Sequence, residues 1–338
     1  MSTPIPKAVL EDDNILACKQ AGLKLIHQGK VRAIFELPGY LGLLLMVMTN
    51  RVSIFDFVLR YLVPRKGEVL TATTVFWLTQ VFRDIKNHLV AFGRNIDDYL
   101  PNTLQRHPLL RARAVVVKEL EIVPVEFIVR GYLTGSAWRA YQNGNLLPGM
   151  TQDDIPSDPF NGIKLVRPVF TPTTKAKSGH DMPISPEEVA DQYGSRLANQ
   201  SVQLFEKAAV FAREHGLELL DTKFEWSVDG TLADEVFTPD SSRFALVEDL
   251  EAATEARKPP PAYDKELVRA WGLTVETPFG VTGLNKLDPA NIEHVEFAHS
   301  LSVPNEIIEK TTERSLRFFG KLTGMSLDKF QRNEMGVV

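Results

Sequence analysis

The chain is poor in cysteine, in long apolar runs and in excess positive charge. Its single cysteine, Cys18, cannot form an internal disulfide and excludes a multi-cysteine zinc or iron–sulfur site. No run approaches the roughly 18 apolar residues of a membrane span, and the strongest, residues 41–48, indicates a buried strand instead. The N-terminus lacks a basic region followed by an apolar core, so we expect no secretory signal and a cytoplasmic location.

The charge balance is slightly acidic. Lysine and arginine number 38 against 43 aspartates and glutamates, for a net charge of -5, which argues against a nucleic-acid-binding surface. The composition, 44% hydrophobic and 24% charged, is that of an ordinary globular protein, and 338 residues suffice for two domains around a cleft. Any anionic ligand must therefore be met by local basic groups.

Apolar patterning predicts an α+β protein. Two apolar runs, 31–37 and 41–48, flank Pro38-Gly39 and predict an antiparallel hairpin. Apolar residues at helical spacing predict a helix over 70–88. Ser185 begins a capping box, with glutamate three residues later, and so starts a helix. The remaining predicted elements are strands at 114–117 and 125–132, continuation of the capped helix to 216 with a break near Gly194, and a last helix at 304–322.

The most informative segment is residues 217–240. If residues 217–227 form a strand, alternation places three charged side chains on one face: Asp221, Lys223 and Glu225. Asp229-Gly230 indicates a two-residue hairpin turn, which would set Glu225 directly opposite Asp234.

Two facing carboxylates repel unless a cation or proton lies between them. With Asp221 and Glu235 nearby, the oxygen-only set suits Mg²⁺. The alternative is a solvent-facing hairpin with alternating charges, and this segment alone favours neither.

Four further segments could bind anions. Gly29-Lys30 precedes the first hairpin and could approach a polyphosphate, although one glycine is a weak signal. Ser136 lies where a helix N-cap is expected, close to Arg130, which outlines an anion site or else a plain capped helix. Residues 171–181 are polar and basic and could form a lid or an ordinary loop. Arg243 follows a hydroxyl-rich turn and could receive a phosphate or remain solvated.

Taken together, these segments resemble the SAICAR synthetase family, the phosphoribosylaminoimidazole-succinocarboxamide synthases of purine biosynthesis. The resemblance covers about residues 22–270, with a similar closing helix. The motifs that carry it occur in the family's order: residues 29–32, 53–56, 66–71, Val129-Arg130-Gly131-Tyr132-Leu133-Thr134-Gly135-Ser136, Gly179-His180-Asp181, Asp221-Thr222-Lys223-Phe224-Glu225 and residues 234–243.

The resemblance implies an ATP-dependent ligase that joins carboxyaminoimidazole ribotide to L-aspartate and releases ADP and phosphate, with an acyl phosphate as intermediate. It implies a two-lobed fold with an antiparallel-sheet lobe at 1–117, a larger α+β lobe at 118–338, and the ATP cleft between them. The expected cofactors are ATP and Mg²⁺. The expected partners are small-molecule substrates, with no nucleic acid or membrane, for a monomer or small homo-oligomer.

Site residues carry over by motif, each as an expectation from the resemblance. The ATP-binding group is Gly29, Lys30 and Arg32 over the phosphates, Val116 and Lys118 at the adenine, and Glu126 at the ribose. The ribotide phosphate would be bound by Arg130, Ser136 and Arg243, and aspartate would lie near Lys175, His180 and Asp181. Glu225 and Asp234 match the metal-binding acids, and Lys223 and Asp221 the catalytic pair.

The chain departs from the family pattern at some positions. Trp226 and Ser227 follow Glu225 where members commonly have phenylalanine and glycine, and Asn50 and Ile54 replace an aspartate and an alanine. Asn50 and Ile54 argue against a contact between substrate and the strand that contains them. Competing hypotheses are a phosphotransferase of similar fold and a nucleotide-sensing module without catalysis. The binding module is disfavoured because the key charged residues are present: Lys30, Glu225, Asp234 and Arg243.

Overall fold

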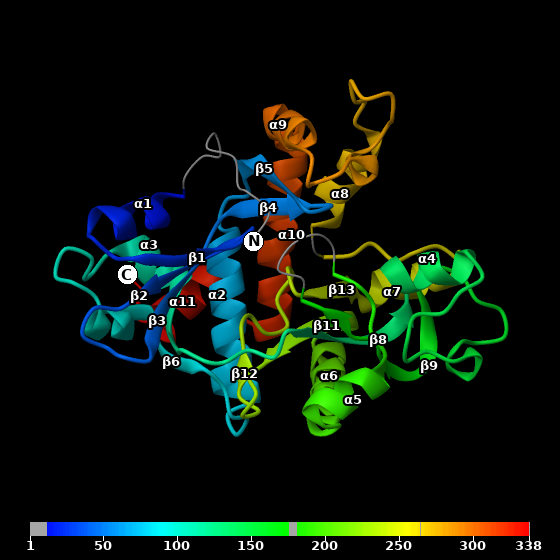
Figure 1. The fold of residues 1–338 in the computed structure, drawn as a ribbon, viewed down its shortest axis with the longest axis horizontal. Coiled ribbons are helices and arrows are strands. Elements are labelled where there is room, and N and C mark those ends of the chain that lie inside the picture. Colours follow the sequence, from blue (N-terminus) through cyan, green and yellow to red (C-terminus); the bar gives the residue numbers. More distant parts are fainter. Residues whose placement is uncertain (1–11, 176–180, 264, 338) are drawn as a thin grey trace.

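The structure, a computed structural model, describes residues 12–175, 181–263 and 265–337. It confirms the predicted α+β class, with strands paired antiparallel in separate sheets (Figure 1). Figure 1 shows the five-stranded sheet on the left and the six-stranded sheet on the right, with helices α2 (Lys66–Phe76) and α10 (Asn305–Thr323) side by side between them. No helix in the described ranges is long and apolar enough to cross a bilayer.

The first sheet has the strand order β1-β2-β3-β7-β6. The predicted hairpin is confirmed as β2 and β3, joined through a turn in which Gly39 takes a φ of 84° that favours glycine. The strands are β1 (Leu25–Gln28), β2 (Arg32–Glu36), β3 (Leu43–Met48), β6 (Leu89–Phe92) and β7 (Ala114–Lys118), with α1 (Asp13–Gln20) and α3 (Pro108–Arg113) packed nearby. A separate two-stranded sheet contains β4 (Arg51–Ile54) and β5 (Phe57–Leu62).

The predicted helix over 70–88 is wrong at both ends. Helix α2 spans Lys66–Phe76 and continues as a π-helical turn over Trp77–Val81. Its start is stabilised by Asn50, whose Oδ1 accepts the Gly67 N–H at 2.9 Å, a bond between distant residues that periodicity cannot reveal. After the π-turn, the main chain of His88 donates to Leu232 O at 3.0 Å, so pairing with the second sheet replaces further helix.

The second sheet has β8 and β11 at its centre. β8 (Val125–Leu133) pairs with β9 (Ile163–Phe170), β10 (Thr173–Thr174) and β11 (Leu217–Trp226), and β11 also pairs with β12 (Leu232–Ala233) and β13 (Ser242–Leu246). The capping box at Ser185 and the break at Gly194 are both confirmed: α5 spans Pro186–Tyr193 and α6 spans Arg196–Glu214, packed on the sheet.

The remaining helices pack on this sheet, on the β4–β5 sheet or along α2. They are α4 (Gly135–Gln142), α7 (Val247–Glu255), α8 (Glu266–Thr274), α9 (Ile292–Ser300), α10 (Asn305–Thr323) and α11 (Leu327–Asn333). The predicted last helix is confirmed as α10, whereas α11 was not predicted. Both helices pack against α2, so the end of the chain lies beside its first long helix (Figure 1). The predicted division at 117 and 118 falls at the end of β7.

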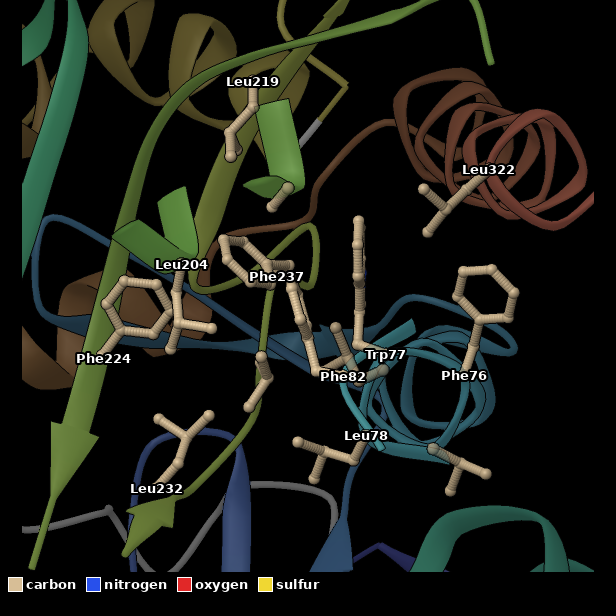
Figure 2. Close-up of a cluster of buried hydrophobic side chains, with 14 of the residues drawn as sticks. Phe76, Trp77, Leu78, Phe82, Leu204, Leu219, Phe224, Leu232, Phe237 and Leu322 are labelled. Atoms are coloured by element: carbon tan, nitrogen blue, oxygen red, sulfur yellow. The ribbon is translucent and has the colours of Figure 1, made fainter. Parts of the chain in front are cut away.

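A core of aromatic side chains joins the two sheets. Figure 2 shows Trp77 and Phe82 of the α2 region close to Phe237, which lies between β12 and β13, with Phe224 of β11 beyond it. The ring centroids of Trp77 and Phe237 lie 5.0 Å apart and those of Phe224 and Phe237 lie 5.1 Å apart. Since Phe237 comes three residues after Asp234, this packing sets the acidic hairpin against the first half of the chain.

Residues 281–300, for which the sequence suggested no function, complete a separate small core. Helix α9 packs on β5 and buries His299, and neither ring nitrogen has a hydrogen-bond partner among the described residues. Burial, helped by the charge of Arg60, lowers the pKa of His299. The neutral ring is therefore favoured in the fold.

This burial predicts an acid-sensitive fold. The contribution of His299 to the free energy of unfolding is fully present above its unfolded pKa of about 6.5 and is lost as pH falls through its lower folded pKa. We expect His299→Met to reduce the loss of stability on acidification, measured by urea unfolding at several pH values between about 5 and 7.5. If the His299→Met variant lost stability with falling pH as steeply as wild type, His299 would not be the cause of the acid sensitivity.

Candidate functional site

The acidic hairpin differs by one residue from its predicted register. Glu225 pairs with Ala233 rather than Asp234, because the loop has three residues, Val228 to Gly230, closed by Ser227 N donating to Thr231 O at 3.0 Å. Gly230 takes the left-handed conformation that such a loop requires. The solvent-facing alternative is wrong as well, since Asp221 and Glu225 are both buried.

Asp234 nevertheless comes within electrostatic reach of Glu225. It leaves the ladder in the left-handed region, at φ 66°, which aspartate tolerates better than most residues. Burial raises the pKa of Asp234 to about 7, and the negative charges of Glu225 and Glu235 raise it while Arg32 opposes them. The predicted convergence of acids thus arises from backbone conformation rather than from cross-strand pairing.

Two cations from distant segments pair with these acids. Arg32 of β2 forms ion pairs with Asp234 and, at 3.0 Å, with Glu235, and Lys175 pairs with Glu225. Burial alone would raise the pKa of Glu225, but Lys175, Arg32 and Lys223 together lower it to about 2. Glu225 is therefore ionised at neutral pH. The ion pairs of Arg32 also connect β2 of the first sheet to the acids that follow β12 in the second.

Lys223 lies on the same strand, next to these acids. Its Nζ donates to Glu126 Oε1 on β8 at 2.7 Å. Burial alone would lower the pKa of Lys223, but Glu126 and Glu225 outweigh it and raise the pKa, so the ammonium group stays charged. Glu126, predicted at the ribose, thus contacts a predicted catalytic lysine.

A second charged cluster surrounds Asp221, four residues before Glu225 on β11. Asp221 pairs with Arg130 at 3.2 Å and with Arg243. The Arg130 Nη2 donates to Ser136 Oγ at 2.9 Å. Gly135 takes a φ of 58°, which favours glycine, and a Cβ atom there would lie 2.8 Å from Arg243 Nη1 and displace the guanidinium. The structure brings together all three residues predicted at the ribotide phosphate.

One detail of that cluster was predicted wrongly. Helix α4 begins at Gly135 with Thr134 as its N-cap, so Ser136 lies inside the first turn. Its hydroxyl accepts from Arg130 instead of capping the helix. The helix starts two residues earlier than predicted, because Thr134 has the extended conformation of an N-cap and Gly135 already belongs to the first turn.

The residues predicted to bind the nucleotide phosphates and base lie at the β1–β2 turn and on β7. Gly29 forms a tight turn, its N–H donating to Arg32 O at 2.9 Å, and Lys30 pairs with Asp56 of the β4–β5 turn. Val116 lies buried inside the first sheet, paired with both neighbouring strands, whereas Lys118 is exposed at the end of β7.

The predicted aspartate residues are only partly described. Lys175 contacts Glu225, and Asp181 is exposed. His180 lies outside the described residues.

Sequence reasoning missed a buried ion cluster behind the site. Asp240 pairs with Lys66 of α2 at 3.1 Å and with Lys265, next to α8, at 3.4 Å. These lysines, with Arg32, lower the pKa of Asp240 despite its burial. Lys66 and Asp240 both lie in segments that carry the family resemblance, but no spacing indicates a contact between residues so far apart.

The donor chemistry is compatible with Mg²⁺. Among the described residues no three acids, histidines or cysteines form a closed metal cage. Mg²⁺ is commonly held by only one or two carboxylates, with water and phosphate oxygens as its other ligands, and two carboxylates, those of Glu225 and Asp234, would meet that number.

Comparison with known proteins identifies the family. The SAICAR synthetase family model matches residues 25–281. This chain belongs to the SAICAR synthetase family. The phosphoribosylaminoimidazole-succinocarboxamide synthase of Thermodesulfovibrio yellowstonii is 37% identical over 317 residues, covering 91% of this chain and 98% of that protein. The synthase of that name from Saccharomyces cerevisiae is 36% identical, covering 89% and 95%.

Solved structures of SAICAR synthetases agree with this fold. The SAICAR-synthase from Saccharomyces cerevisiae complexed with SAICAR has a TM-score of 0.72 and 33% identity, covering 90% of this chain and 96% of that one. A SAICAR synthetase (Type-2) in complex with ADP has a TM-score of 0.58 at 18% identity, which bears on the fold alone. The predicted family, fold class and enzyme class are confirmed.

Proposed function

We propose that this chain joins carboxyaminoimidazole ribotide and L-aspartate to form SAICAR, with ATP converted to ADP and phosphate. The names of its relatives support this reaction. The observation that carries the proposal is the order of charges along β11: Asp221 with its two arginines, then Lys223, then Glu225 with the acid cluster. Asp221 and Glu225 are four residues of strand apart, about 13 Å, and Lys223 lies between them.

The ribotide is held at both ends in this proposal. Arg130, Ser136 and Arg243 bind its phosphate, and Asp221 positions the two arginines. Lys223, kept charged by its acidic neighbours, holds the carboxylate that reacts. Substrate anions are thus met by local basic groups in an acidic protein.

ATP lies across the first sheet in this proposal. Gly29, Lys30 and Arg32 cover its phosphates, and the exposed segment after Val116, starting at Lys118, contacts the base. Glu225 and Asp234 would hold Mg²⁺, which supplies charge neutralisation for the phosphates. Lys175 and Asp181 contact the aspartate substrate.

The proposed reaction has two steps. A carboxylate oxygen of the ribotide attacks the γ-phosphorus, a new O–P bond forms, and ADP leaves as the β–γ bridge breaks. The aspartate amine then attacks the acyl carbon, the C–O bond breaks, and phosphate leaves with the bonding electrons and takes up the proton that the amine loses. In this proposal Lys223 neutralises the negative charge that develops on the acyl oxygen when the amine attacks, and its hydrogen bond to Glu126 preorganises it for that role.

The test is the dependence of product formation on each component. We expect ADP and SAICAR to form in equal amounts only when ATP, Mg²⁺, the ribotide and aspartate are all present, measured by chromatography of the nucleotides. ADP formation at the full rate without aspartate would point to a phosphotransferase instead. ATP binding by calorimetry without turnover would point to a binding module.

A further inference from the structure

The turn between Asp234 and Arg243 contains a buried hydroxyl with an unusual number of partners. Thr238 Oγ1, fully buried, donates to Glu235 Oε2 at 2.5 Å. The same oxygen accepts the main-chain N–H groups of Asp240 and Ser241, each at 3.2 Å. One side chain therefore both closes the turn and binds a buried carboxylate.

Glu235 extends this contact to the proposed nucleotide loop. Its other oxygen, Oε1, accepts from Arg32 Nη1 at 3.0 Å. Arg32 also pairs with Asp234, the proposed metal ligand. If Asp234 held a cation, Glu235 would be the carboxylate that stays paired with Arg32, and the Thr238 hydroxyl donates to Glu235.

The other end of the turn leads to the proposed ribotide site. The Thr238 carbonyl accepts from Ser242 N at 2.9 Å. Ser242 Oγ lies 2.7 Å from Thr222 Oγ1 on β11, and Ser242 directly precedes Arg243. All of these hydroxyls are buried, so water does not compete for them.

We propose that Thr238 is a positioning residue that fixes Arg32, through Glu235, relative to the turn that presents Arg243. This inference rests on the proposed function, since it assumes that Arg32 binds nucleotide phosphate and that Arg243 binds the ribotide. Thr238 itself touches neither substrate. Its hydroxyl fixes the distance between Arg32 on the first sheet and Arg243 on the second.

The test uses two variants that remove different parts of Thr238. Thr238→Val keeps the shape and removes the hydroxyl, and Thr238→Ser keeps the hydroxyl and removes a buried methyl group. We expect Thr238→Val to raise the Kd of ADP in Mg²⁺ buffer about tenfold, measured by calorimetry, because it removes a hydrogen bond to a charged group. We expect Thr238→Ser to stay within about twofold of wild type, although its Tm falls.

A matched control comes from the adjoining β11–β12 hairpin. Thr231 is also buried, and its hydroxyl donates to Asp229 Oδ1 at 2.7 Å, at the tip away from the site. Thr231→Val should lower the Tm and leave the Kd of ADP unchanged. If Thr238→Ser weakened ADP binding as much as Thr238→Val, the hydroxyl would not be the cause and the inference would be wrong.

A double-mutant cycle tests the route through Glu235. In a Glu235→Gln background, the single amide oxygen cannot replace both carboxylate contacts, so Thr238→Val should change the Kd of ADP by less than about twofold. The full tenfold effect in both backgrounds would overturn the inference. Failure of the wild-type protein to bind ADP would instead refute the proposed function, so the two failures are distinguishable.

Discussion

Asp234→Asn is expected to lower Mg²⁺-dependent turnover about a thousandfold, a loss of several kcal/mol of transition-state stabilisation. Asparagine cannot supply the negative charge that Asp234 contributes beside Glu225. The measurement is the rate of ADP formation as a function of Mg²⁺ concentration. We expect part of the loss to be recovered at high Mg²⁺ if the metal is bound more weakly.

The same substitution should leave the fold at least as stable as wild type. It removes a buried carboxylate that faces two others, and asparagine tolerates the left-handed conformation found at this position. Arg32 keeps its pair with Glu235. The midpoint of urea unfolding checks this part of the prediction and separates loss of chemistry from loss of structure.

Asp229→Asn is the matched control, because Asp229 lies in the same hairpin and pairs with exposed Lys86. Turnover of that variant should equal that of wild type, since exposed ion pairs contribute little. An Asp234→Asn enzyme within about twofold of wild-type turnover would show that this carboxylate is not a metal ligand.

Arg243→Ala is expected to raise the KM for the ribotide by about 10- to 100-fold, the loss of one or two charge-assisted hydrogen bonds to phosphate. The KM for ATP should change little, because Arg243 lies with Arg130 beside Asp221, four residues along β11 from Glu225. Initial-rate measurements with each substrate varied in turn separate the two constants.

Arg257→Ala provides the control for Arg243. Arg257 also pairs with an aspartate, Asp158, at 2.6 Å, but that pair is exposed. We expect no change in either KM for this variant. A rise confined to ATP in the Arg243→Ala enzyme would mean that the two anion sites have been assigned the wrong way round.

Local patterns predicted the elements best where the cause of structure is itself local. The capping box at Ser185 and the turn at Gly39 depend on residues a few positions apart, and both were correct. The helix over 70–88 failed because its start depends on Asn50 and its end on pairing of His88 with Leu232. Neither partner can be identified from spacing.

The same distinction between local causes and distant contacts applies to single residues of the site. Charge alternation along residues 221–225 correctly placed Asp221, Lys223 and Glu225 on one strand. The opposing register was wrong by one residue, because Gly230 adds a left-handed residue to the loop. The contacts of Asp240 with Lys66 and Lys265, and the role inferred for Thr238, require partners from other parts of the chain.

The sequence by itself determined that this protein is acidic, contains one cysteine, lacks a long apolar run and contains in order the motifs of the SAICAR synthetase family. Those properties depend on residue type and order alone. Only the tertiary structure decided which charges meet: Arg32 with Asp234 and Glu235, and Arg243 with Asp221. The reason is physical, since buried charges must be paired, and packing and strand register determine which partners come within reach.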